Sequence, residues 1–329
     1  MQSGGEYTSK IGLYGQEDLG GGLKAEFNVE AGFQADTGAV QDTTSLFNRA
    51  SWIGLASRDW GSIRLGNQIA ASQPLFIDVF GVIPTNSVIA WAGAAVVQTG
   101  KGIGYNADLG PGSTTLQTRV PKSVSYRTLR WNGLGAQLMW AANANGGASP
   151  NTAYRGSVLS YQNGPYYFAV NYSQIWSAPV AVNQRSVAVR NDLYGAGGVY
   201  DTGRIVLSTS FLQYAPKLAG NGIARVYALG SILPVARHTW RASLVLRDTS
   251  GVHDMGGKSV SSSALGVMLG YDYDLSKLTA LYVRTGMIKN YGFSTIPLNN
   301  VPLATQAGST NPQLGALSSS LSLGIYHHF

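Results

Sequence analysis

The sequence predicts an all-β chain that folds as a transmembrane antiparallel β-barrel, and three observations support this prediction. Apolar and polar residues alternate with a period of two over much of the chain. The predicted strands are joined by short and long connections in turn, as in barrels that cross a membrane. Only 12% of the 329 residues are charged, about half the share of roughly 25% in soluble domains. Yet no apolar run reaches the ~18 residues that a membrane-spanning helix needs.

The clearest alternation lies between residues 23 and 34. It places on one face Leu23, Ala25, Phe27, Val29, Ala31 and Phe33, and on the other Lys24, Glu26, Asn28, Glu30 and Gln34. A helix would scatter the apolar set around its circumference, whereas a strand separates the two sets. Similar alternation recurs in residues 168–172, 240–246 and 265–273, which are therefore predicted as further strands.

The connections between the predicted strands differ in length and composition. The short ones carry the turn sequences EDLGGGLK, SRDWGS, YQNGPYY, YDTGRI and YDLSKL, in which Asp, Asn and Gly supply the positive φ angles of tight hairpins. The long ones are predicted at residues 35–48, 69–118, 177–189 and 291–317. This division gives about fifteen strands, whereas bacterial barrels of this kind close with an even number. We therefore expect that an N-terminal strand is missing, the alternative being that two strands have been merged.

Composition excludes some functions and favours a compartment. The formal net charge is +7, but Lys and Arg stand singly along the chain, so no nucleic-acid-binding surface is predicted. The excess of basic residues either keeps the protein soluble or lines a cavity that attracts anions. The absence of cysteine favours an oxidising compartment. The first six residues lack the basic start and apolar core of an export signal, so an exported protein would be present here in a mature or truncated form.

The sequence offers little support for enzyme chemistry. None of the four histidines stands at metal-ligand spacing, and the stretch GGGLK lacks the strand–loop–helix context of a phosphate-binding loop. We expect no cofactor, no metal site and no enzymatic activity. The alternative is a barrel lipase, in which His238 or His253 would need a serine and an orienting third group.

Five stretches together resemble the general porins of Gram-negative bacteria, and most closely those of β-proteobacteria: GQEDLGGGLKAEFNVEAGF, FNRASWIGLASRDWGSIRLGNQ, NGPYY, GYDYDLSKLTALYV and LGIYHHF. They occur in the family's order and cover nearly the whole chain. The resemblance implies one 16-stranded barrel over residues 1–329 in outer-membrane lipid, three barrels per functional unit, and passive diffusion of small hydrophilic solutes and ions. It also implies that the longest connection, about residues 69–118, folds into the lumen, and that the terminal Phe329 is a signal for barrel assembly.

The resemblance also points to the residues of a pore constriction, where fixed charges set ion preference. Arg49 in FNRASW and Arg119 in RVPKSVSYR match wall arginines of the family, and alternation assigns Trp52 to the face opposite Arg49. Asn67 and Tyr14 stand where relatives carry arginine, so we expect a less electropositive constriction.

Other arginines alternate with apolar neighbours and are further candidates for inward charges: Arg127, Arg241, Arg247 and Arg284. For each of them the alternative is a structural pair with an acidic residue such as Glu26, Glu30 or Asp272.

The loop sequence PLFIDVFGVIPTNSVIAWAGAAVV is mostly apolar and contains one acid, Asp78, with Asp108 further on. An acidic loop would attract cations. Because the loop of this chain contains few acids, we expect a mild preference for anions. The apolar residues either form a hydrophobic constriction or pack against the wall.

Two functional alternatives stay open. One is a substrate-selective porin whose apolar loop and Tyr14 form an aromatic track. The other is a non-conducting barrel that acts as an adhesin or an outer-membrane enzyme.

Overall fold

The computed structural model describes residues 3–5, 7–73, 77–81, 87–93, 96–115, 117–145, 151–253, 256–299 and 301–328. Fifteen strands form one antiparallel sheet in the order in which they follow along the chain, apart from a separate hairpin. The strands of the sheet are β1 (Lys10–Gly20), β2 (Leu23–Gly32), β3 (Ala50–Ser57), β4 (Gly61–Ile69), β7 (Arg119–Arg127), β8 (Leu134–Ala141), β9 (Ala153–Asn163), β10 (Tyr166–Val182), β11 (Arg185–Asp201), β12 (Val206–Pro216), β13 (Ile223–Val235), β14 (His238–His253), β15 (Ser259–Asp274), β16 (Thr279–Gly292) and β17 (Leu317–His327). This confirms the predicted all-β, antiparallel fold.

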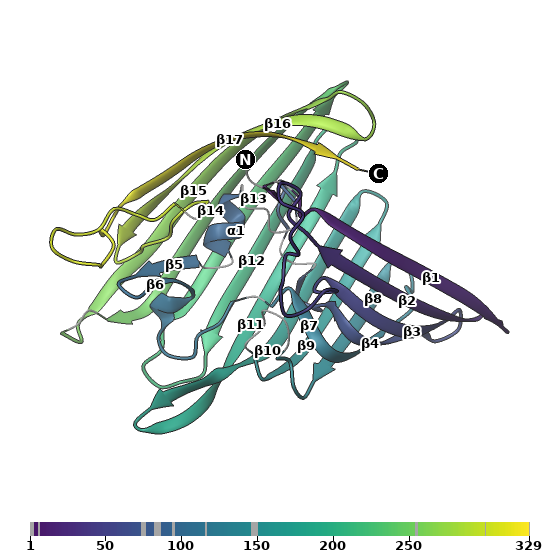
Figure 1. Cartoon of the computed structure of the whole chain (residues 1–329), viewed down its shortest axis with the longest axis horizontal. Coiled ribbons are helices and arrows are strands. Elements are labelled where there is room, and N and C mark those ends of the chain that lie inside the picture. Colours follow the sequence, from purple (N-terminus) through teal and green to yellow (C-terminus); the bar gives the residue numbers. More distant parts are fainter. Residues whose placement is uncertain are drawn as a thin grey trace.

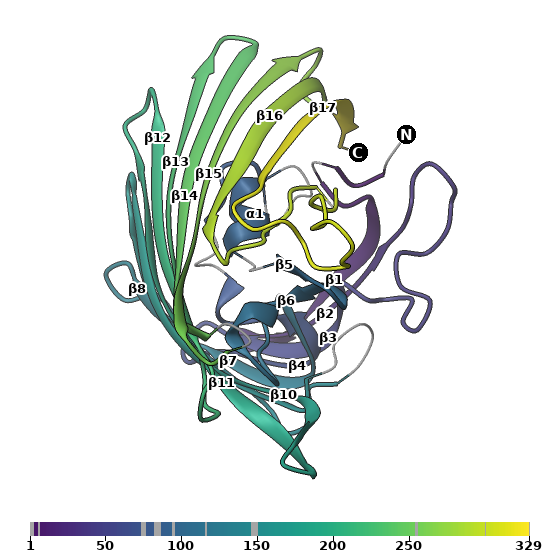
Figure 2. The ribbon, with the colours of Figure 1, turned by 90° about the vertical axis from the view of Figure 1, so that its left-hand side faces the viewer.

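The sheet curves around the segment that joins β4 to β7 (Figures 1 and 2). This segment contains the helix α1 (Val88–Gly93), the hairpin β5 (Val96–Thr99) and β6 (Gly102–Tyr105), and the short 3-10 helix η2 (Ala107–Leu109). Figure 2 shows α1 enclosed by the curve of the sheet. The long connection is therefore the element that shapes the interior.

The two edges of the sheet are β1 and β17. In the described residues, β1 pairs with β2 and β17 with β16, and the two edges are not paired with each other. The chain ends approach one another through side chains, because the Tyr7 ring lies 5.3 Å from that of Tyr326 and 5.6 Å from that of His328.

Alternation along the strands separates an exposed apolar face from the interior. On β17, the side chains of Leu321, Leu323 and Ile325 are 61–76% exposed, and they alternate with serine and glycine. Such an outward apolar row is what a membrane-spanning strand presents to lipid. Within the described residues, no helix is long and apolar enough to cross a membrane.

The prediction of a long connection at residues 177–189 is wrong. The strands β10 and β11 continue through it and meet at a two-residue turn formed by Asn183 and Gln184. Both turn residues have positive φ angles, 48° and 63°, which is the geometry that matches the twist of paired strands. The turn lacks the glycine that marks tight hairpins in a sequence, so the sequence did not predict it.

Candidate functional site

The helix α1 packs on the inner face of the sheet, against β13, β14, β15 and β16. All six of its residues, Val88–Gly93, are buried. The hydroxyl of Tyr214 on β12 donates a hydrogen bond of 2.6 Å to the carbonyl oxygen of Gly93. The apolar residues of the described part of the loop therefore pack against the wall.

Glycines on the inner face of the sheet make room for this loop. A Cβ atom at Gly230 would lie 2.5 Å from Cγ1 of Val79, and one at Gly266 would lie 3.0 Å from Cβ of Val88. At Gly270 an added Cβ would clash with the ring of Phe80. Because real Cβ contacts are wider than this, the close approach of loop and wall requires small residues on these strands.

A buried charge cluster fixes the start of the loop to the same wall. Asp272 on β15 is 1% exposed and accepts contacts from two arginines, Arg241 Nε at 2.7 Å and Arg284 Nη2 at 2.6 Å. Arg241 also donates to the carbonyl oxygen of Val79, and the Arg284 guanidinium lies 5.3 Å from the Phe80 ring centre. The carboxylate of Asp272 is thus the shared partner of the two arginines beneath the loop.

The far end of the loop is held by Arg247 on β14. Its guanidinium donates to both carboxylate oxygens of Asp108 at 2.8 Å and to Oδ1 of Asn106 at 3.1 Å. The Arg247 side chain is 1% exposed. Bidentate pairing of this kind fixes geometry as well as charge, so both ends of the described loop are tied to β14.

The opposite wall, made by β1–β4 and β7, has a different balance of charge. Glu30 on β2 accepts contacts from Lys10 Nζ at 2.8 Å and Arg49 Nε at 2.7 Å. Arg119 donates from Nε to the backbone carbonyl of Arg49 at 2.7 Å, so two arginines and one lysine stand around a single carboxylate.

A second group on this wall centres on Glu26. It accepts a hydrogen bond from the Tyr14 hydroxyl at 3.1 Å and pairs with Arg64 Nη2 at 3.1 Å. The Arg64 guanidinium stacks 4.0 Å from the centre of the Trp52 ring, and the Tyr14 and Trp52 rings are 6.5 Å apart. The prediction that Trp52 faces away from Arg49 is therefore wrong. Arg49 precedes the first residue of β3, where the regular alternation does not yet apply.

Two further predicted residues lie near this wall. Arg127 stands opposite Ser62 on β4, and in the described part of the chain its buried Nε has no hydrogen-bond partner. Asn67 shares its row on β4 with Leu65 and Ile69, which are both exposed. Its amide donates to the carbonyl oxygens of Phe47 and Asn48. Asn67 is three residues from Arg64 on β4, so regular alternation places it in the other row, apart from the inward charges.

The structure thus divides the predicted constriction residues between two places. We call the group Lys10, Arg49, Arg64, Arg119 and Arg127, with Glu26 and Glu30, the cationic wall, and Tyr14 lies within it. Arg284 belongs to the Asp272 cluster on the other side. Asp78 accepts hydrogen bonds from the Phe80 amide at 3.0 Å and from the Ser87 hydroxyl, so it shapes the loop itself. Phe329 lies outside the described residues.

Sequence reasoning missed Lys10 and Arg64. Arg64 stands between Ile63 and Leu65, so the same alternation that identified Arg127 could have identified it. Lys10 begins the first strand and offers no comparable signal, because its contact with Glu30 depends on the β1–β2 register.

This arrangement, a curved antiparallel sheet with an outward apolar face and an inward loop beside fixed charges, defines a membrane channel of the porin class. The chain belongs to the Gram-negative porin family, whose model matches residues 1–292. It is similar to the outer membrane porin protein 32 of Delftia acidovorans, with 29% identity over 100% of this chain and 87% of the relative. It is also similar to an outer membrane porin protein of Bordetella pertussis, with 28% identity over 89% of this chain and 80% of the relative.

Solved structures agree with the sequence comparison. An anion-selective porin from Comamonas acidovorans has a TM-score of 0.73 and 26% identity, and the match covers 99% of this chain and 90% of that one. A trimer form of OmpT from Vibrio cholerae has a TM-score of 0.65 at 13% identity, covering 98% and 91%, and this likeness shows the fold alone. Membership of the family places the chain in the outer membrane as a channel for passive diffusion. Its relatives are channels rather than enzymes.

Proposed function

We propose that the channel conducts small hydrophilic solutes and ions passively, with a mild preference for anions, through the space between the cationic wall and the long loop. The observation that carries this proposal is the charge balance of the cationic wall. Five basic side chains stand there against the two carboxylates of Glu26 and Glu30. Fixed charges that line a narrow aqueous path raise the local concentration of ions of the opposite sign.

The loop side adds little to this field. Arg241 and Arg284 share Asp272, and Arg247 pairs with Asp108. These groups leave one excess positive charge, against three on the cationic wall, and the helix α1 carries no charge. The proposed transverse field therefore comes mainly from the cationic wall. The similarity to a porin described as anion-selective supports the sign of the preference.

In this proposal the predicted constriction residues have separate roles. Arg49, Arg119 and Arg127 supply positive charge, and Tyr14 positions the Glu26 carboxylate. Arg284, Asp78 and Asn67 hold the loops in place. The whole chain forms one barrel domain whose loop of about residues 69–118 narrows the lumen. Three such barrels assemble, as the trimer form of the Vibrio cholerae protein does. Phe329 keeps its expected role as the assembly signal.

Planar bilayer recordings under a tenfold salt gradient test the proposal. The wild-type protein should give stepwise conductance and a reversal potential of the sign for anion preference, and R119S should move that potential toward zero. R58Q is the matched control, because Arg58 is largely exposed beside Asp59, outside the cationic wall. A folded protein without conductance would support a plugged adhesin or enzyme instead, and an unchanged potential in R119S would refute the assigned role of the wall.

A second candidate function is a channel selective for aromatic anions, and the ring pair on the wall favours it. Tyr14 and Trp52 lie close to the Arg64 guanidinium, so a planar carboxylate could meet both a ring face and a cation. Saturable block of single-channel current by benzoate, but not by acetate, would support this function. Equal and non-saturating effects of both anions would exclude it.

A further inference from the structure

The connection between β16 and β17, residues 293–316, enters the curve of the sheet beside the long loop. Figure 2 shows it next to α1 and the hairpin β5–β6. Residues 294–298 of this connection are buried, and Ile296 and Leu298 belong to the same apolar cluster as Val97 on β5. Two connections that lie far apart in the chain therefore meet within the curve of the sheet.

Gln98 on β5 joins the two connections through both its backbone and its side chain. Its backbone amide donates to the carbonyl oxygen of Thr295 at 2.9 Å, and the Thr295 hydroxyl donates to the carbonyl oxygen of Gln98 at 2.6 Å. Its side-chain Oε1 accepts from the amide of Leu303 at 2.6 Å, and Nε2 donates to the carbonyl oxygen of Leu303 at 3.4 Å. The residue is only 7% exposed, so these contacts are shielded from competing water.

Residues 303–313 form a small unit within this connection, which we call the lid. Thr305 and Pro312 form an antiparallel bridge, and two further backbone hydrogen bonds of 2.7 and 2.9 Å join the arms of the lid. Leu303 and Pro312 are buried, and the other residues of the lid are exposed. The lid is therefore folded by its own backbone bonds and has little apolar surface that could anchor it to the rest of the protein.

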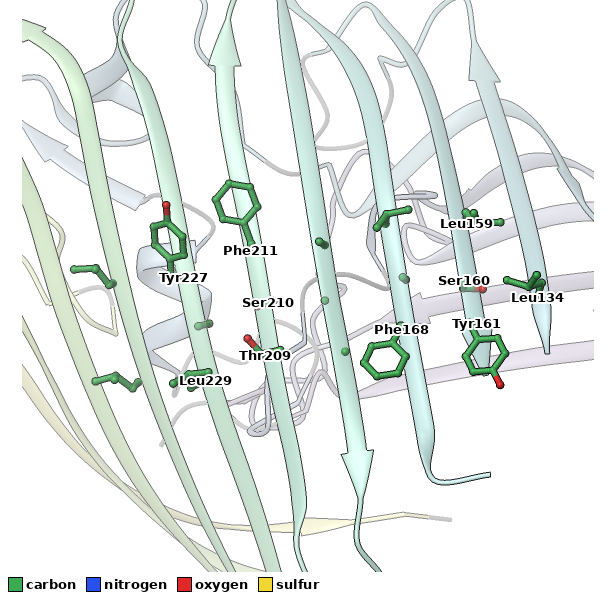
Figure 3. Close-up of a pocket in the computed structure, with 18 residues that line it drawn as sticks. Leu134, Leu159, Ser160, Tyr161, Phe168, Thr209, Ser210, Phe211, Tyr227 and Leu229 are labelled. Atoms are coloured by element: carbon green, nitrogen blue, oxygen red, sulfur yellow. The ribbon is translucent and has the colours of Figure 1, made fainter. Parts of the chain in front are cut away.

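A hollow of about 730 Å³ lies between the lid and the tip of the β5–β6 hairpin. It is lined by residues of the tip, including Lys101, and by Thr310 and Asn311 of the lid. A hollow of similar volume, about 770 Å³, lies on the outward face of β8–β14, but its lining is apolar and includes Phe168 and Phe211 (Figure 3). The polar hollow under the lid suits water and hydrophilic solutes, whereas the outward one faces hydrocarbon.

The lid has few direct contacts with the hairpin beneath it. A Cβ atom at Gly100 would clash with Oδ1 of Asn311 and would lie 3.3 Å from Oγ1 of Thr310, so the two segments touch at the hairpin tip. Among the described residues, the hydrogen bonds between the lid and the hairpin are the two that the Gln98 side chain makes with Leu303. The position of the lid thus depends chiefly on one side chain.

We propose that the lid opens and closes part of the channel mouth, and that Gln98 is the positioning residue that holds it closed. Such a lid presupposes the passive conductance proposed above. Asn299 and Gly315 flank the lid in the left-handed region, with φ angles of 54° and 68°, and a few residues at the ends of a loop are enough to act as hinges. The lid contains no charged residue, so its movement changes the width of the aqueous path and leaves the field of the cationic wall unchanged.

Planar bilayer recordings of single channels test the role of Gln98. The wild-type protein should remain mostly at one conductance level and visit a higher level rarely, in steps smaller than the conductance of one barrel. Q98A keeps the backbone bonds to Thr295 and loses both bonds to Leu303, so it should occupy the higher level about tenfold more often. Its reversal potential should equal that of the wild-type protein. Q162A is the control, because Gln162 is an exposed residue near the short-turn end of β9.

A cysteine pair fixes the lid independently of Gln98. The chain contains no cysteine, and the close approach of Gly100 and Asn311 suits a disulfide in G100C/N311C. Oxidised G100C/N311C should lack the higher conductance level, and dithiothreitol should restore it. In Q98A/G100C/N311C, oxidation should return the occupancy of the higher level to that of the wild type or below. A general loss of stability in Q98A would not be reversed by a bond at this one place.

Three outcomes would overturn the proposal. The first is equal occupancy of the conductance levels in wild type, Q98A and oxidised G100C/N311C. The second is a folded G100C/N311C protein in which no disulfide forms under oxidising conditions. The third is a shift of the reversal potential in Q98A as large as that in R119S, which would assign the effect to charge rather than to width.

The lid and the channel itself fail in different ways. If Q98A does not fold, oxidised and reduced G100C/N311C carry the same comparison. Conductance without a higher level would refute the lid and leave the channel in place, whereas absence of conductance in every folded variant would refute the proposed function and the lid with it.

Discussion

The two walls of the channel both contain arginine, but the arginines have different roles on each wall. On β13–β16, arginine is buried beneath the loop and matched by Asp272, and glycines admit Val79, Phe80 and Val88. On β1–β4 and β7, arginine outnumbers the carboxylates. Because buried charges are tolerated only when they are paired, each arginine of the covered wall has to contact a carboxylate. A wall beside an aqueous path can keep an excess of charge, since water solvates it.

The largest effect is expected when the negative charge of Asp272 is removed from the wall beneath the loop. D272N should leave Arg241 and Arg284 buried without a counter-charge and lower the free energy of unfolding by about 3–5 kcal/mol. Urea unfolding in lipid bilayers measures the change. D59N is the control, because Asp59 is 71% exposed beside Arg58 and should change stability by less than about 1 kcal/mol. Equal loss in both variants would contradict the buried-cluster interpretation.

The next largest effect concerns the room that the loop occupies. In G270V, the new side chain meets the Phe80 ring, so the loop has to move toward the lumen at a cost of about 1–3 kcal/mol. Single-channel conductance should fall together with stability. The double variant G270V/F80A should recover part of the conductance, whereas no change in G270V would show that the loop does not rest on this glycine.

A matched pair of arginine substitutions compares the walls directly. Arg49 and Arg241 each contact one carboxylate at 2.7 Å, with side chains 16% and 14% exposed. R49Q should lower the anion-to-cation permeability ratio about twofold, because it removes charge from the aqueous side. R241Q should lower stability and leave the ratio nearly unchanged. The reversal potential gives the permeability ratio of each variant. Equal shifts of this potential in R49Q and R241Q would contradict the proposed difference between the walls.

The smallest effect is expected at Tyr14. Y14F removes one hydrogen bond to Glu26 at an exposed position, so stability should fall by about 0.5–1 kcal/mol. Arg64 still pairs with Glu26, and the permeability ratio should stay within experimental error. A large change in the ratio would mean that Tyr14 contacts the permeating ions itself.

The sequence by itself determined the strands and their faces. Alternation is a local property, and a period of two reports which row a residue belongs to wherever the strand is regular. Fifteen strands and the outward row of β17 follow from it. It failed where the backbone departs from regular pairing, at Arg49 just before the start of β3 and at the turn formed by Asn183 and Gln184.

Only the tertiary structure decided which charges are matched. Arg119 and Arg284 look alike in the sequence, since both alternate with apolar neighbours. Yet Arg284 is paired with Asp272 beneath the loop, and Arg119 contacts a backbone carbonyl on the opposite wall. Arg247 and Asp108 are 139 residues apart in the chain. Alternation gives the face of a side chain but not its partner, because partners meet only when the sheet has curved and the loop has entered it.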